Sequence, residues 1–131
     1  MADSDIALIA HLMRRAGFGA TYEELKQRAA KGYEATVEEL IFPEKQPDID
    51  LDLMHRCNIA WMDLNSIEPT HDYWIYRMVN SPRPLEEKIS LFWHGILCVG
   101  YSKCDNALQI IVLVDKFRRH GLGDFPTCWS N

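Results

Sequence analysis

A length of 131 residues fits a single domain, and the shares of hydrophobic (47%) and charged (25%) residues are ordinary for a globular protein. The net charge of −5 provides no positive field for nucleic acid or for an anionic membrane surface, so neither is expected as a partner. No apolar run approaches the roughly 18 residues that a transmembrane helix needs.

The segment 5–16 predicts the first helix. Its apolar residues recur at spacings of three and four, and Arg14 and Arg15 suit the negative end of the helix dipole. Gly17 is then expected to cap the helix. Gly17 and Gly19 after two arginines also suggest a phosphate-binding loop, but the segment lacks the lysine and the preceding strand of a nucleotide site. We therefore interpret both glycines as structural.

Two short helices and a linker are predicted next. Thr21 and Glu24 form a T-x-x-E capping box for a helix that ends at Gly32, a residue suited to a left-handed stop. The pattern from Tyr33 to Phe42 predicts a third helix. Its inward residues are expected to be Val37, Leu40 and Ile41. The prolines and charges of residues 43–50 then predict an internal linker.

The remainder of the chain predicts four more helices. The first two are expected over about 50–65 and from Pro69 to Asn80, and Pro84 then opens a central helix that runs to Leu97. Asp105 or Asn106 is expected to cap a last helix, although its IIVLV stretch taken alone is typical of a strand. The fold class predicted is all-α, a small or incomplete bundle of six to seven short helices.

Three separated blocks identify a family. They are AHLMRRAGFGATYEEL (10–25), RMVNSPRPLEEKISLFWHGIL (77–97) and FRRHGLGDF (117–125). In order and spacing they resemble the N-terminal part of the bacterial family called domain of unknown function 1800 (DUF1800), over about Ile6 to Phe125. The resemblance implies a helical protein without an established activity, whose relatives are usually several times longer and often exported. It also implies that residues 1–131 form a single helical domain or the N-terminal fragment of a larger one, truncated after about Phe125.

His94 and Cys98 are the first candidates for a metal site. They stand four residues apart, so both side chains would share one helical face and could reach zinc. A complete site would need further ligands such as Cys104 and His120, with His55 or His71 as other choices, and no spacing requires this. The block of the resembling family reads W-H-x-H-F, whereas Ile96 here replaces its second histidine. We expect no bound cofactor, with His94 packed beside Trp93 and a zinc site as the alternative.

Arg77 and Arg83 are candidates for binding a ligand, because they flank the N-S-P-R-P turn. Arginine at these positions anchors the turn through carbonyl groups or binds a carboxylate ligand, and we favour the structural role. The adjacent Glu86 and Glu87 would point about 100° apart on a helix, so they suit the positive helix end better than paired acid–base chemistry. Trp93 is expected in the core.

The cysteines and the start of the chain bear on the compartment. The N-terminal segment has its acids before its apolar residues and its arginines after them, which is the reverse of a signal peptide. The cysteines have no C-x-x-C spacing. Reduced thiols and a cytoplasmic location are therefore expected for the chain as given.

Two classes of function follow from the sequence. The first is a non-catalytic interaction or scaffold module, which binds the rest of its own family domain or a second copy of itself. Its surface would be the tail Phe125–Trp129 and an uncovered side of the last helix, formed by Leu108, Ile111, Val112 and Phe117. The alternative is an enzyme or metal-binding fragment around His94, Cys98, Arg77 and His120. The sequence contains no nucleophile elbow, P-loop or dinucleotide fingerprint, so the interaction module is preferred.

Overall fold

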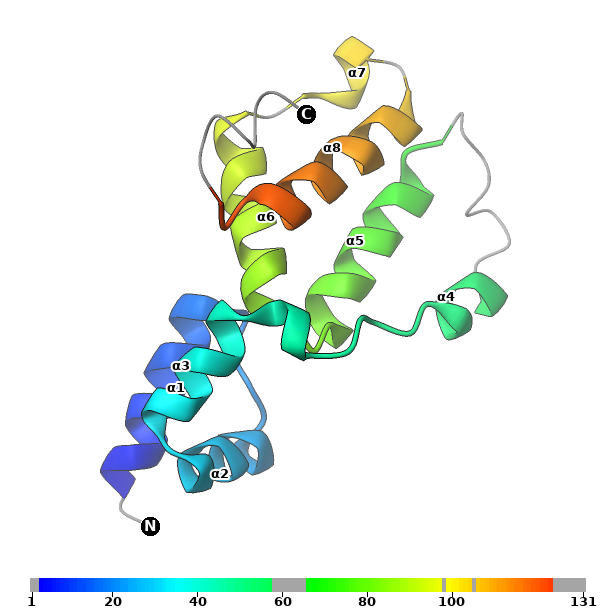
Figure 1. The fold of residues 1–131 in the computed structure, drawn as a ribbon. Helices are drawn as coiled ribbons and strands as arrows, with labels where there is room; N and C mark the ends of the chain where they lie inside the picture. The colour runs from blue at the N-terminus through cyan, green and yellow to red at the C-terminus, as the bar shows by residue number, and fades with distance from the viewer. Residues whose placement is uncertain (1–2, 58–65, 98, 105, 124–131) are drawn as a thin grey trace.

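The computed structural model describes residues 3–57, 66–97, 99–104 and 106–123, and it confirms the predicted all-α class (Figure 1). Within these residues the chain forms eight α-helices and one 3₁₀ helix, without a strand. The helices are α1 (Asp3–Ala16), α2 (Tyr22–Lys31), α3 (Tyr33–Ile41), η1 (Pro43–Lys45), α4 (Asp52–Cys57), α5 (Glu68–Asn80), α6 (Pro84–Ile96), α7 (Tyr101–Cys104) and α8 (Ala107–His120). No helix in the described part is long and apolar enough to cross a membrane.

The helices form two groups that meet at the start of α6 (Figure 1). Helices α1, α2 and α3 make one group, and α5, α6 and α8 make the other. Leu85, in the first turn of α6, packs against the core of the first group. Helix α6 therefore belongs to the second group and also joins it to the first.

The first group has its core between α1 and α3. Ile9 and Met13 of α1 pack with Leu40 of α3, and all three side chains are buried. The predicted capping box of α2 is confirmed. The Glu24 amide donates to Thr21 Oγ1 (3.3 Å), and the Thr21 amide donates to Glu24 Oε2 (2.7 Å). Both bonds satisfy amides that the helix start leaves without partners.

The predicted inward face of α3 is partly wrong. Ile41 is 54% exposed, and Thr36 is buried instead. Thr36 and Leu40 stand four residues apart and share one side of the helix, whereas Ile41 is rotated a further 100° outward. The Thr36 hydroxyl donates to the Gly32 carbonyl (2.9 Å), which makes its burial possible.

The two glycines after α1 have roles different from the predicted cap. Gly19, not Gly17, has a positive φ of 106°. Gly17 is required by a close approach, because a Cβ atom there would lie 3.0 Å from Pro84 Cβ and 3.2 Å from the Met13 carbonyl oxygen. Pro84 is held at the first position of α6, so this contact sets how closely the two groups of helices approach.

Helix α8 contains the IIVLV stretch, and tertiary packing makes it helical. Asn106 caps it as predicted, since its side-chain oxygen accepts from the Gln109 amide (3.2 Å). The buried side of α8 is formed by Ala107, Ile110, Val114, Phe117 and Arg118. The prediction that Phe117 lies on an uncovered side is therefore wrong, because Phe117 is only 2% exposed. Leu108 and Val112 do point outward.

Other differences from the predicted elements are local. The helix predicted over 50–65 begins at Asp52, and residues 58–65 lie outside the described part of the chain. Helix α7 is not predicted by the sequence, because four residues carry too little periodicity. The predicted linker contains η1. The tail Phe125–Trp129 also lies outside the described residues.

A pair of glycine substitutions tests the contact between the two groups. We expect Gly17→Ala to lower the free energy of unfolding by about 1–3 kcal/mol, since the new methyl group meets a proline ring and a backbone carbonyl that cannot easily move. Gly95 is exposed in α6, and no atom lies within 4 Å of the position that a Cβ atom would take there, so Gly95→Ala should raise stability by about 0.5–1 kcal/mol. Urea denaturation measures the free energy of unfolding of both variants. Equal changes would contradict the close approach of Gly17 to Pro84.

Candidate functional site

The centre of the second group is a buried carboxylate between two arginines. Glu87 of α6 is 0% exposed. Its Oε1 atom accepts from Arg77 Nε of α5 (2.9 Å) and from Arg118 Nε of α8 (2.8 Å), and its Oε2 atom accepts from Arg118 Nη2 (3.2 Å). Both arginines are themselves buried. One carboxylate therefore joins α5, α6 and α8 through charge-assisted hydrogen bonds.

Further donors of the two arginines also bind groups of the same chain. Arg77 donates from Nη1 to the Tyr73 hydroxyl (3.3 Å) and from Nη2 to Asp48 Oδ1 (3.2 Å), and Arg118 pairs with Asp115. The two guanidinium groups lie 5.7 and 6.0 Å from the Tyr73 ring centroid. Desolvation lowers the pKa of Arg77, but the hydrogen bonds and charge interactions with Glu87 and Tyr73 together outweigh this effect and raise the pKa overall.

A polar cavity of about 210 Å³ adjoins this network. Its charged lining consists of Asp48, Arg77, Arg83, Glu86, Asp115, Arg118 and Arg119. Four arginines thus face three carboxylates, and Glu87 below them supplies the fourth negative charge, so the opposite charges cancel. Burial raises the pKa of Glu86, because its partner Arg83 lies 3.9 Å away and does not fully compensate for lost hydration.

Arg83 anchors the linker that precedes α4. Its Nε atom donates to the Gln46 carbonyl oxygen at 3.0 Å. The carbonyl partner of Arg83 belongs to the linker and not to the N-S-P-R-P turn. Arg77 binds carboxylates and a hydroxyl of the same chain. Burial raises the pKa of Asp48, but the Ile49 amide and then Arg77 outweigh it and lower that pKa overall.

The candidate metal ligands do not converge within the described part of the chain. No group of three or more histidine, cysteine, aspartate or glutamate side chains there is placed to hold an ion. The rings of His94 and Trp74 pack edge to face (centroids 4.9 Å apart), and burial lowers the pKa of His94. The Cys104 thiol lies 3.2 Å from Gln109 Oε1, and His120 ends α8. Cys98 lies outside the described residues.

Trp93 has a structural position and is half-buried rather than fully buried. Its Nε1 atom donates to the Gly121 carbonyl oxygen at 3.0 Å, which ties α6 to the end of α8. A Cβ atom on Gly121 would lie 2.6 Å from Ile89 Cγ2 and 2.9 Å from Trp93 Cδ1. Trp93 therefore holds the C-terminal part of α6 against the end of α8.

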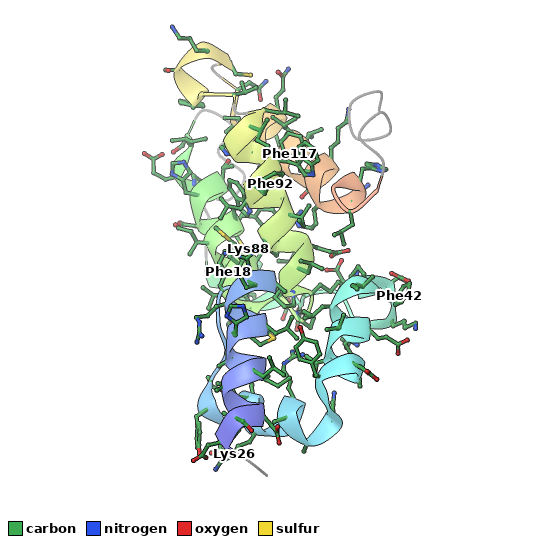
Figure 2. The ribbon with its side chains drawn as sticks, turned by 90° about the vertical axis from the view of Figure 1, so that its left-hand side faces the viewer. Phe18, Lys26, Phe42, Lys88, Phe92 and Phe117 are labelled. Carbon is green, nitrogen blue, oxygen red and sulfur yellow. The ribbon has the colours of Figure 1, made fainter. Side chains whose placement is uncertain are left out.

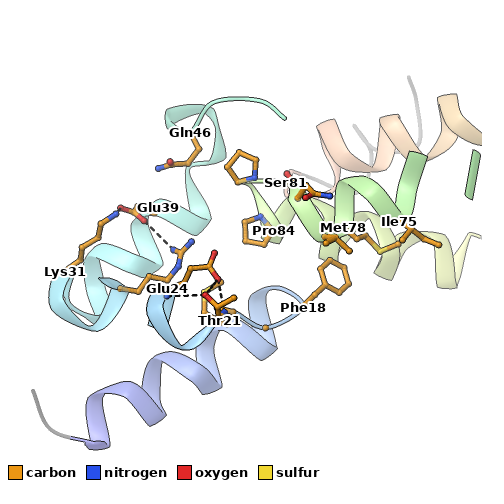
Figure 3. Close-up of a pocket in the computed structure, with 17 residues that line it drawn as sticks. Phe18, Thr21, Glu24, Lys31, Glu39, Gln46, Ile75, Met78, Ser81 and Pro84 are labelled. Carbon is orange, nitrogen blue, oxygen red and sulfur yellow. Dashed lines mark hydrogen bonds and ion pairs between the residues drawn. The ribbon is translucent and has the colours of Figure 1, made fainter. Parts of the chain in front are cut away.

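A cleft of about 820 Å³ lies between the two groups of helices (Figure 3). One side is apolar and is lined by Phe18, Ile75, Met78 and Val79. The other side carries Glu24, Arg28, Lys31 and Glu39. These charges are paired locally, because Glu39 accepts from Lys31 Nζ (2.7 Å) and lies 3.5 Å from Arg28 Nη1, while Glu24 caps α2. The charged side is therefore occupied by its own ion pairs, and the apolar side is the part of the cleft that is open to a partner.

That apolar side continues onto the outer surface of α6. Lys88 Nζ lies 4.9 Å from the centroid of the Phe18 ring, and Phe92 follows Lys88 by one helical turn (Figure 2). We call the exposed set the outer apolar face; its members are Phe18, Ile75, Val79, Phe92 and Ile96. Val79 is 76% and Phe92 56% exposed. Phe92 stands on the side of α6 away from Glu87.

The family comparison matches nearly the whole chain. The family described as "Protein of unknown function (DUF1800)" matches residues 11–129. The chain belongs to the DUF1800 family. Comparison with curated proteins and with solved structures found no match. The family description assigns no activity, so the function of this DUF1800 chain has to be inferred from its own side chains.

The buried network has a signal in the sequence, although a second interpretation competes with it. In α8 the position of Arg118 is in phase with Val114 and Phe117, and in α5 that of Arg77 is in phase with Tyr73. Charged residues in the apolar phase of neighbouring helices indicate buried ion pairs. Glu87 does lie in the first turn of α6, as the sequence indicates, but its partners Arg77 and Arg118 are not evident from that position.

Removal of the central charge tests the network. We expect Glu87→Gln to lower the free energy of unfolding by about 3–5 kcal/mol, because it keeps the side-chain shape and leaves two buried arginines without their shared counter-ion. Urea denaturation followed by circular dichroism measures the change. A loss below about 1 kcal/mol, as for an exposed ion pair, would contradict a shared buried carboxylate.

The neighbouring Glu86 should respond in the opposite sense and depend on pH. A carboxyl whose pKa is raised by folding binds its proton more tightly in the folded state, so its stabilising contribution exists at low pH and is lost as the pH rises through that pKa. Glu86→Gln should therefore increase stability at neutral pH and have little effect near about pH 3.5. Denaturation midpoints at both pH values measure this, and an equal effect at both would contradict the raised pKa.

Proposed function

We propose that this DUF1800 chain is a non-catalytic helical interaction module, whose outer apolar face binds an amphipathic helix of a partner protein. The observation that carries this proposal is the exposure of large apolar side chains on adjoining elements, such as Val79 on α5 and Phe92 on α6. Large apolar surfaces that remain open in a chain of this size mark interaction sites. The module needs no resident cofactor and no nucleic acid partner.

The spacing of these side chains supports a helical partner. Ile75 and Val79 stand four residues apart on α5, and Phe92 and Ile96 stand four apart on α6. Pairs at this spacing form the ridges that fit between the side chains of another helix. The apolar side of the cleft, with Phe18 at its edge, supplies the groove that such a helix needs (Figure 3).

Cations at the edge of the face support acidic flanks on the partner. Arg14 and Arg15 lie in the last turn of α1, within four residues of Phe18, and Lys88 contacts the Phe18 ring. Within the described part of the chain, no ion pair joins any of these three cations to a carboxylate. Exposed charges at the rim of an apolar patch steer partners of the opposite sign.

The buried network supports a role without catalysis. Glu87 is enclosed by its arginines, and the donors of Arg77 and Arg118 are directed to groups of the same chain. These charges hold helices together, and in the adjoining cavity the arginines are balanced by carboxylates of the same chain. The alternative, a metal or catalytic site around His94 and Cys98, has no supporting geometry in the described residues.

Site-specific photo-crosslinking tests the proposal. Benzoylphenylalanine in place of Phe92 should form a covalent adduct with a protein in the cells that naturally produce the chain, because this ring lies in the contact. The same group in place of Glu23, an exposed residue on α2, is the matched control and should form little adduct. The absence of an adduct at position 92, or equal adducts at both positions, would contradict an interaction at the outer apolar face.

A further inference from the structure

We infer that the helix received by the outer apolar face is α3 of a second copy of this chain. This inference rests on the proposed interaction function and names its partner. It assigns a role to α3, whose outward side has no covering element within the described residues and is not used by the site above.

The outward side of α3 carries the kinds of residue that we expect in a partner of the outer apolar face, namely apolar residues beside acidic ones. Tyr33 and Ile41 are exposed, with half-buried Val37 between them at four-residue spacing. Glu34 and Glu38 are exposed beside this apolar stripe. The solvent side of α3 therefore has an apolar stripe of its own, and the polar residues beside that stripe are acidic.

Charges on the two surfaces are complementary. No ion pair joins Glu34 or Glu38 to a cation in the part of the chain that the structure describes, whereas the third carboxylate of this segment, Glu39, is held by Arg28 and Lys31. The two outward carboxylates of α3 thus match the cations beside Phe18. Opposite charges around an apolar contact give specificity and fix its orientation.

Helix α8 also exposes apolar residues, but it fits less well. Helix α8 exposes Leu108 and Val112, but its last turn carries the exposed Arg119. An α8 helix in the groove would bring a further cation toward Arg14, Arg15 and Lys88. Electrostatics therefore favour α3 over α8 as the occupant.

The positions of the two surfaces determine the kind of assembly. Figure 2 shows Phe18 and Lys88 on one side of the molecule and Phe42, which follows α3, on the other. One copy therefore offers α3 and the next copy offers its outer apolar face, so the contact is heterologous. Such a contact extends from copy to copy, as an open chain or a closed ring.

The inference is tested with two variants of the full chain that each damage one side of the contact. Lys88→Glu alters the receiving face, and the double variant Glu34→Lys, Glu38→Lys alters the inserted helix. In light scattering, the wild-type mass should rise with concentration, and each variant should associate at least about tenfold more weakly. Glu23→Lys reverses an exposed carboxylate away from α3 and should associate as the wild type does.

A mixture of the two variants gives the decisive measurement. Each variant keeps the side that the other has lost, and the two reversed sides carry opposite charges, so an equimolar mixture should regain the association that each variant alone has lost. A mixture that stays monomeric, or a wild type that stays monomeric up to about 1 mM, overturns the inference. Unchanged circular dichroism and urea midpoints show that the variants are folded.

The two proposals fail in different ways. A crosslinked adduct at position 92 with the mass of two chains supports α3 of a second copy as the occupant. An adduct with a different protein overturns the self-association and leaves the interaction module intact. The absence of any adduct overturns the interaction module, and the self-association with it.

Discussion

The bonds around Glu87 set the arrangement of the second group of helices. A carboxylate with no exposed surface requires partners, because an unpaired buried charge would cost several kcal/mol. The two partners come from different helices, and guanidinium groups bind in a fixed planar geometry. Apolar contacts alone would allow α5, α6 and α8 to slide. Together with the bond from Trp93 to the Gly121 carbonyl, the shared carboxylate favours one register, so its main contribution is specificity of packing rather than net stability.

The outer apolar face is a consequence of that arrangement. Arg77 and Glu87 must point inward, and at 100° per residue Val79 and Phe92 then point outward on roughly the opposite sides of α5 and α6. The rotation of α5 and α6 that buries Arg77 and Glu87 therefore also exposes the apolar residues on the other side of each helix. Phe18 joins the same surface because the Gly17–Pro84 contact brings the end of α1 against the start of α6.

Local features of this fold could be predicted from the sequence, because their partners are close in the chain. The caps at Thr21 and Asn106 and the proline start of α6 depend on residues within about four positions. Ile41 and Phe117 were assigned to the wrong sides because apolar identity does not fix the phase of a helix in the fold. Which side of a helix is buried depends on which other helix packs against it, and that is determined by residues distant in the sequence.

The candidate site was less predictable for the same physical reason. Glu87 lies ten residues from Arg77 and 31 residues from Arg118, so their contact exists only after three helices have packed. The cleft likewise exists only between two groups of helices. The sequence identified Arg77 and Arg83 as important through their place beside a turn, but their partners are fixed by tertiary structure.

The charges of the chain separate into two populations with different consequences. Those of Glu87 and its arginines are desolvated and paired, so salt screens them little. Those of Lys88, Glu34 and Glu38 lie at the surface, where ions reduce interactions beyond about 8 Å at physiological ionic strength. The net charge of −5 opposes association of two copies only through such screened, long-range repulsion. Ion pairs formed in direct contact at the edge of an apolar face act at much shorter range, so a chain with net negative charge can still bind its own acidic helix.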